Sequence, residues 1–222
     1  MALDHGPKIV TNGLVLSLDA ADINSYPGAG TTWYDTSGYR YNHTLTSTSL
    51  TTFKGVKCFN FSSTGYARPT STTYTFTQNY TMLAWASALS DAEVATWRTL
   101  WRTTPDDHPL LIQDGTDLLG YYDNNAGGFV SFGATLSGLG LANKWTMFTI
   151  TGVGGSTSLY YDRANFVGTV AYTANGNSHD LIGSAGGSQA FGYVATAMLY
   201  SRALSVDEIA QNYNVTKGRF GL

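Results

Sequence analysis

The sequence predicts an all-β protein in which two antiparallel sheets pack face to face and a short helix closes the chain. Charged residues make up only 12% of the 222 residues, whereas aromatic residues make up 14% and glycine occurs 25 times. Segments with alternating apolar and polar residues recur at short intervals. Turn sequences that tolerate a positive φ separate them, such as "NNAGG", "GVGGS" and "SAGGS". Many strands at this spacing are typical of a β-sandwich.

The alternation, together with enrichment in β-branched and aromatic residues, predicts the individual strands. Their expected ranges are Leu14–Leu18, Val56–Phe61, Asn79–Ser87, Trp97–Arg102, Leu110–Gln113, Asp117–Tyr122, Gly128–Phe132, Lys144–Val153, Ser156–Asp162, Phe166–Tyr172, His179–Ile182 and Phe191–Tyr200.

One segment near the end, "LSVDEIAQNYN", predicts a helix. Ser205 is a suitable N-cap, and Glu208 three residues later completes the spacing of a capping box. Ile209 and Tyr213 then lie on one face. The stretch "SDAE" has the same spacing, but its continuation turns into a strand, so we expect one helical turn there at most.

Length and charge limit the possible partners. A chain of this size with 43% hydrophobic residues can form one sandwich, so we expect a single domain over residues 1–222. The net charge is -3 and no run of Lys or Arg occurs, which argues against nucleic acid and against an anionic membrane surface. No signal peptide and no membrane span is visible, so we expect a soluble chain. The lone Cys58 has the setting of a buried strand thiol.

Signatures of common enzymes are missing. A glycosidase needs a pair of carboxylates beside the scissile bond, and the chain has only two glutamates, Glu93 and Glu208. Asp106 and Asp107, like the acids of "QDGTD", stand in turn-like sequence. There is no G-x-S-x-G, no H-E-x-x-H and no Cys–His metal spacing. The sequence therefore predicts that the protein is not an enzyme, although an unrecognised glycan hydrolase stays open as an alternative.

The second half of the chain resembles a known superfamily. Trp145 opens a strand in "NKWTMFTITGVGG", a Tyr-x-Asp turn follows in "YYDR", and "LIGS", "LYSRALS" and "VDEIAQNYN" come later. These motifs resemble the concanavalin A-like lectin and glucanase superfamily in its laminin-G-like form, which implies a two-sheet antiparallel jelly-roll. The family usually has Asp-Gly where this chain has Asp162-Arg163, so we expect a longer or differently shaped turn there.

The two ends resemble a narrower group. "GLVLSLDAADINSYPGAGTTWYDTSG" and the final "GRFG" are similar to segments in structural proteins of tailed phages and large aquatic viruses. The resemblance implies a place on a virion surface, with capsid or other virion proteins as partners. A symmetric homo-oligomer is a further expectation, since such assemblies are common on virions.

Two aromatic and acidic clusters are candidates for a glycan site. Sugar rings stack on aromatic rings while their hydroxyl groups bond to short polar side chains. The better candidate is "YYDNN", although one of its two tyrosines must point into the sandwich because side chains alternate along a strand. The other is "WYD", whose tryptophan could equally cap the edge of the core. The candidate glycan residues are Tyr121, Tyr122, Asp123, Asn124, Trp33, Asp35 and His108.

A metal ion is a further hypothesis. Asp and Asn side chains on loops are the oxygen ligands that calcium prefers, and several relatives of this fold hold calcium. Asp123 and Asn124 are the best candidates, although no EF-hand spacing occurs.

These features together predict a non-catalytic module on a virion surface that binds host-cell glycans or decorates a capsid. The alternatives are a purely structural capsid cement protein without sugar binding, and the unrecognised glycan hydrolase.

Overall fold

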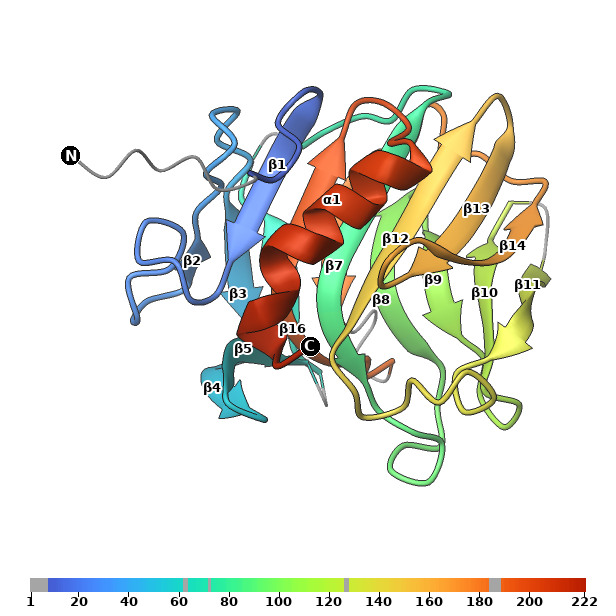
Figure 1. Ribbon diagram of the computed structural model, residues 1–222, viewed down its shortest axis with the longest axis horizontal. Helices are drawn as coiled ribbons and strands as arrows, with labels where there is room; N and C mark the ends of the chain where they lie inside the picture. The colour runs from blue at the N-terminus through green and yellow to red at the C-terminus, as the bar shows by residue number, and fades with distance from the viewer. Residues whose placement is uncertain (1–7, 62–63, 72, 126–127, 184–188) are drawn as a thin grey trace.

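The computed structural model, which describes residues 8–61, 64–71, 73–125, 128–183 and 189–222, confirms the two-sheet antiparallel sandwich (Figure 1). Sheet A has the strand order β14-β13-β12-β7-β16-β5-β4, and β1 also pairs with β16. Sheet B has the order β11-β10-β9-β8-β15-β6-β3-β2. The single α-helix of the described residues, α1, lies across the outer face of sheet A (Figure 1).

The strands of sheet A are β1 (Leu14–Asp19), β4 (Leu50–Phe53), β5 (Val56–Phe61), β7 (Tyr80–Ala88), β12 (Thr146–Val153), β13 (Ser156–Tyr161), β14 (Asn165–Val170) and β16 (Gly192–Tyr200). The strands of sheet B are β2 (Thr32–Trp33), β3 (His43–Thr46), β6 (Tyr66–Pro69), β8 (Arg98–Thr104), β9 (Asp107–Ile112), β10 (Leu118–Asp123), β11 (Gly128–Thr135) and β15 (Ser178–Gly183).

The expected strands are all present with small shifts at their ends, but four short ones were missed. These are β2, β3, β4 and β6, with two to four residues each, too few for an alternating pattern to show. A further correction concerns Asp107, which belongs to β9 and not to a turn, so that this strand begins before the expected Leu110 and includes His108. Pairing with β8 and β10 holds this segment extended despite its turn-forming residue types.

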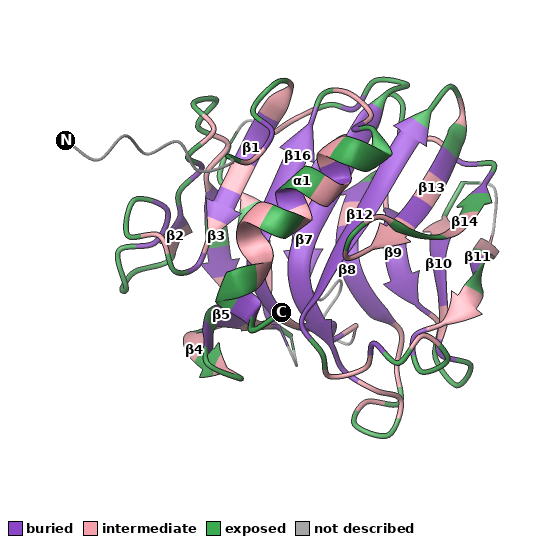
Figure 2. Ribbon diagram, viewed as in Figure 1, coloured by how far each residue is buried: buried purple, intermediate pink, exposed green. Residues whose placement is uncertain are grey.

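The core lies between the sheets, and a second apolar layer lies under the helix. Met82 and Ala84 of β7 belong to the cluster between the sheets. Leu83 and Trp85 face the other way and join the cluster below α1. All nine residues of β7 are therefore buried, although their side chains still alternate between two faces (Figure 2).

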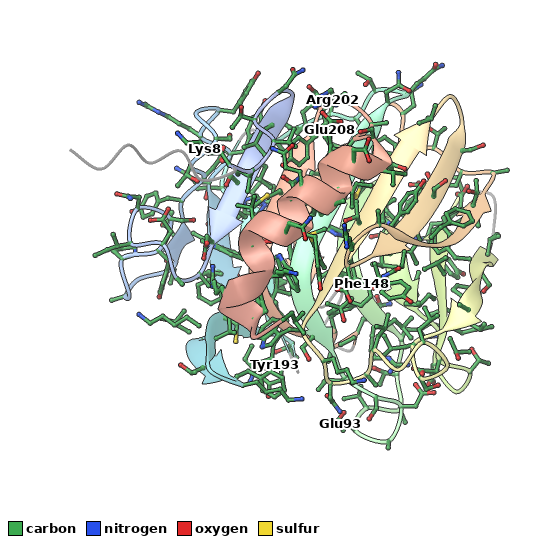
Figure 3. All side chains as sticks on the ribbon, in the orientation of Figure 1. Lys8, Glu93, Phe148, Tyr193, Arg202 and Glu208 are labelled. Carbon is green, nitrogen blue, oxygen red and sulfur yellow. The ribbon has the colours of Figure 1, made fainter. Side chains whose placement is uncertain are left out.

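The expected helix is present as α1 (Val206–Thr216), followed by the 3-10 turn η1 (Lys217–Phe220). Ser205 and Glu208 form the predicted capping box. Arg202 adds an ion pair to Glu208 at 2.5 Å, and the two side chains lie at the upper end of the helix in Figure 3. This ion pair holds the pKa of the Glu208 carboxyl at about 2.

The helix is joined to sheet A mainly through Trp85. Its ring stacks on Phe220 with a centroid distance of 4.0 Å and on Tyr213 at 5.6 Å. Its indole Nε1 donates to Thr216 Oγ1 at 2.7 Å. A buried tryptophan with a bonded N–H thus holds both α1 and η1 against the sheet.

We expect Ser205→Ala to lower the free energy of unfolding by about 1 kcal/mol, because the Glu208 amide loses its hydrogen bond to the Ser205 hydroxyl. Ser205→Asp keeps a side-chain acceptor at the N-cap and is the matched control. Urea unfolding of both variants measures the difference. Equal losses in the two variants would contradict a capping role.

Two smaller expectations are also confirmed. The link from β13 to β14 is the three-residue turn 162–164, in which Asp162 has φ 49° and Ala164 φ 62°.

Cys58 is fully buried, and burial raises the pKa of its thiol to about 11, so the thiolate is scarce at neutral pH.

Candidate functional site

A pocket of about 280 Å³ opens on the face of sheet B that points away from sheet A. It is lined by Trp97, His108, Leu111, Tyr122, Asn124 and Gln189. Three of the predicted glycan residues, His108, Tyr122 and Asn124, therefore meet in one place.

Strand pairing explains why these residues converge. Tyr122 of β10 lies directly opposite His108 of β9, and their rings meet edge to face at 6.2 Å. Alternation sends the preceding Tyr121 the other way, into the core, where it stacks on Tyr172 at 4.1 Å. The prediction that one of the two tyrosines points inward is confirmed, and Tyr122 is the one at the pocket.

Aromatic rings form one side of the pocket. Trp97 meets Tyr122 edge to face at 5.9 Å and Phe129 at 5.5 Å. Phe129 can lie across β10 because Gly120 has no side chain there. A Cβ on Gly120 would come within 2.3 Å of the Phe129 ring. Trp97 thus packs on both other rings, while Trp97 and Tyr122 remain partly exposed.

His108 presents a neutral ring. Burial lowers its pKa to about 4, and the nearby Arg102 lowers it further than Asp106 raises it. Its Nδ1 lies 3.0 Å from the Thr99 hydroxyl, which donates its own hydrogen to Gln189 Oε1 at 2.5 Å. The hydroxyl has one hydrogen, so His108 Nδ1 donates to it and Nε2 carries the lone pair.

The polar edge of the pocket is held in place by β9. The Asn124 side chain donates to the carbonyl of Asp106, and its backbone N–H donates to Asp107 Oδ1 at 3.0 Å. Asp107 Oδ2 accepts from Asn177 Nδ2 at 2.8 Å and from the Tyr172 hydroxyl at 3.3 Å. These bonds hold the end of β10 against the start of β9.

The two calcium candidates bond to neighbouring backbone groups. Asp123 Oδ1 accepts from the backbone N–H of Asn125 at 2.8 Å, and Asn124 bonds to β9. Among the described residues, no group of three or more His, Cys, Asp or Glu side chains is arranged to hold a metal ion.

The other candidate cluster lies away from the pocket. Trp33 is fully buried against Phe59 at 4.8 Å. Asp35 accepts from the backbone N–H groups of Ser17, Ser37 and Tyr41 at 2.8 to 3.0 Å. Both side chains are used within the fold, in agreement with the alternative that this loop braces the edge of the core.

Sequence reasoning missed Trp97, Leu111 and Gln189 as pocket residues. Trp97 lies just before β8, in a loop whose course cannot be read from strand patterns. Gln189 comes to the pocket because its backbone carbonyl accepts from Thr99 N–H at 3.2 Å, a contact across 90 residues. No local pattern signals such a contact.

Comparison with known proteins by sequence finds no matching family model and no matching curated protein. Comparison of structures finds sandwich domains within larger proteins. The Trypanosoma rangeli sialidase in complex with the inhibitor DANA matches with a TM-score of 0.64 and 16% identity, over 94% of this chain and 34% of that chain. The HCR/D F1240A mutant matches with a TM-score of 0.64 and 18% identity, over 93% of this chain and 52% of that chain.

At these identities the likeness shows the fold alone, and the chain spans about a third of the sialidase's length and about half of HCR/D's. The two antiparallel sheets fit a concanavalin A-like sandwich. The comparisons support neither the laminin-G-like form nor the viral subgroup.

The predicted function is corrected by these findings. The sequence predicted a non-catalytic module on a virion surface, but the structures that resemble this chain include sialidases and HCR/D. A short shared motif at each end of the chain is a weak guide, because one sandwich fold serves many functions. In the described part of the chain, no helix is long and apolar enough to cross a membrane.

Proposed function

We propose that this protein binds carbohydrate in the pocket on sheet B. The observation that carries the proposal is the pairing of two partly exposed rings, Trp97 and Tyr122, with polar atoms that have no partner. Among the described residues, Trp97 Nε1, the Tyr122 hydroxyl and His108 Nε2 make no hydrogen bond, so two donors and one acceptor remain for a ligand. A sugar presents apolar C–H faces and hydroxyl groups that suit this combination.

The structural likeness adds support. The similar sialidase is described in complex with sialic acid, which is itself a sugar. The pocket also has the concave form and mixed lining expected of a small-molecule site.

Binding without cleavage is the form of the proposal that the lining residues favour. None of the six lining residues carries a carboxylate. Both glutamates of the chain bond elsewhere: Glu93 accepts from Ser90 and Asn143, and Glu208 pairs with Arg202. A carboxylate pair for glycoside hydrolysis is therefore not among the residues that line the pocket.

We expect Tyr122→Ala to weaken sugar binding at least about tenfold, because it removes one of the two exposed rings from the pocket. A glycan array on the purified protein, with and without calcium, finds the ligand, and titration calorimetry measures its Kd. Each ligand found is also incubated with the protein and checked for cleavage products.

The matched control is Tyr39→Ala, since Tyr39 is 58% exposed and stacks on Tyr41 away from the pocket. Its Kd is expected to equal that of the unchanged protein. Equal losses in both variants would rule out the pocket as the site, and silence of the unchanged protein across the array would overturn the proposed function.

A further inference from the structure

We propose that the site selects sugars that carry a carboxylate group and that Arg102 recognises this group. The inference rests on the proposed carbohydrate binding and adds the class of sugar to it. It follows from how the neighbouring strands of sheet B arrange their outward-facing charged side chains.

Strand register places Arg102 beside the pocket. Trp101 of β8 pairs with Leu110 of β9, and Thr103 pairs with Asp107. Arg102 lies between these pairs, with its side chain on the face opposite Trp101, which belongs to the core. His108, on the facing stretch of β9, lines the pocket.

A chain of contacts joins the pocket to this arginine. Asn124, which lines the pocket, donates to the Asp106 carbonyl. The carboxylate of Asp106 lies 2.9 Å from Arg102 Nε. Asp180 Oδ2 accepts from the same Nε at 2.7 Å, and Asp180 Oδ1 lies 3.3 Å from Arg68 Nε. Arg102 is thus held from one side, next to a second arginine.

The other side of the guanidinium is open. The shortest contacts of Arg102 with Asp106 and Asp180 use Nε, and in the described part of the chain neither Nη1 nor Nη2 donates a hydrogen bond. The side chain is 21% exposed, and that of Arg68 is 45% exposed. Two adjacent N–H donors on a fixed planar group match the two oxygens of a carboxylate.

The charges next to Arg102 are closely paired. Arg68 and Arg102 balance Asp106 and Asp180, and the carboxylates of Asp107 and Asp123 near Asn124 already accept backbone N–H groups. His108 is neutral at neutral pH, so it carries no positive charge that could bind the carboxylate in place of Arg102. A sugar hydroxyl can accept from only one arm of the guanidinium at a time, whereas a carboxylate can take two parallel charge-assisted bonds. An acidic sugar therefore gains more from Arg102 than a neutral one.

The test compares sugars that differ only in the acid. Titration calorimetry measures Kd for methyl glucuronide against methyl glucoside and for sialyllactose against the methyl ester of its carboxylate. We expect the acidic member of at least one pair to bind about tenfold more tightly or better. Added salt should reduce that preference.

Substitutions of Arg102 then test whether this residue recognises the carboxylate. Arg102→Lys keeps a positive charge beside Asp180 but cannot bind a carboxylate with two parallel N–H groups. Arg102→Gln removes the charge. Both should lose most of the preference for the acid while binding of the neutral sugar stays. Arg163→Lys, in the turn after β13, is the matched control and should change neither. Thermal unfolding verifies that every variant is folded.

The outcomes separate the two proposals. Equal binding of acidic and neutral sugars, or a preference that survives in both Arg102 variants, would overturn the inference while carbohydrate binding stands. Absence of binding to all four sugars and to the glycan array would overturn both.

Discussion

Replacing Arg98 by methionine is expected to lower the free energy of unfolding by about 3 to 5 kcal/mol, because it leaves a buried carboxylate without its cation. The Arg98 side chain is fully buried. It pairs with Asp117 at 3.0 Å and with Asp91, and its Nη1 donates to the carbonyl of Leu89 at 2.7 Å. Asp117 is only 9% exposed in its side chain, so water cannot replace the guanidinium.

The contacts of Asp117 and Arg98 explain why the loss of Arg98 should also affect the pocket. Asp117 Oδ2 also accepts from the backbone N–H of Ser137, so this carboxylate joins the turn before β10 to the segment after β11. Arg98 begins β8, directly after Trp97 of the pocket. A variant that folds at reduced temperature should therefore also bind sugar more weakly.

Urea unfolding monitored by tryptophan fluorescence measures the effect of Arg98→Met. Arg163→Met is the control, since Arg163 is exposed and its replacement should change stability little. A loss in Arg98→Met as small as that in the control would show that the buried network does not stabilise the fold.

Acid is expected to destabilise the protein strongly between pH 6.5 and 4, because three histidines are buried in neutral form. Burial lowers the pKa of His43 to about 4 and that of His108 to about 4, and it lowers the pKa of His179 well below its ordinary value. The unfolded chain therefore binds more protons than the folded one in this range. Their contribution is complete above pH 6.5 and is lost as pH falls toward 4, amounting to about 3 kcal/mol for His43 alone.

Two of these histidines face each other inside sheet B. His43 Nε2 lies 2.8 Å from His179 Nε2, and His43 Nδ1 lies 2.8 Å from the Tyr41 carbonyl, to which it donates. His43 Nε2 is then the acceptor and His179 Nε2 the donor. His179 Nδ1 has no partner in the described structure, and Trp101 packs edge to face on its ring at 5.6 Å. Burial outweighs the bond to Tyr41 and the charge of Asp35, both of which raise the pKa of His43.

The measurement is the free energy of unfolding by urea at several pH values from 7 to 5, a range in which most carboxylates stay ionised. The double variant His43→Gln and His179→Gln should be less stable at pH 7 but show a flatter dependence on pH. The slope that remains reports mainly His108. An unchanged slope in the double variant would contradict the assignment of acid sensitivity to this pair.

Local patterns were sufficient for the longer elements of this fold. The alternation in β7 and β16 and the capping box of α1 depend on neighbours two to four residues away, so the sequence alone predicts them. The same rule predicted that only one of Tyr121 and Tyr122 faces outward. It could not say which one, because that depends on the face that sheet B turns toward sheet A.

The site was predicted only in part for the same reason. Tyr122, Asn124 and His108 were found from residue type, and strand pairing then brought them to one pocket. Trp33 and Asp35 have the same residue types, but the fold buries one and surrounds the other with backbone N–H groups.

Residue order by itself determined that this chain forms a sandwich with a short closing helix, because strand and helix signals are short-range. Only the tertiary structure decided where a ligand can bind. Gln189 reaches Thr99 across 90 residues, and Asp180 reaches Arg102 across 78. Such contacts follow from sheet order and register, which bring together side chains that no local pattern relates.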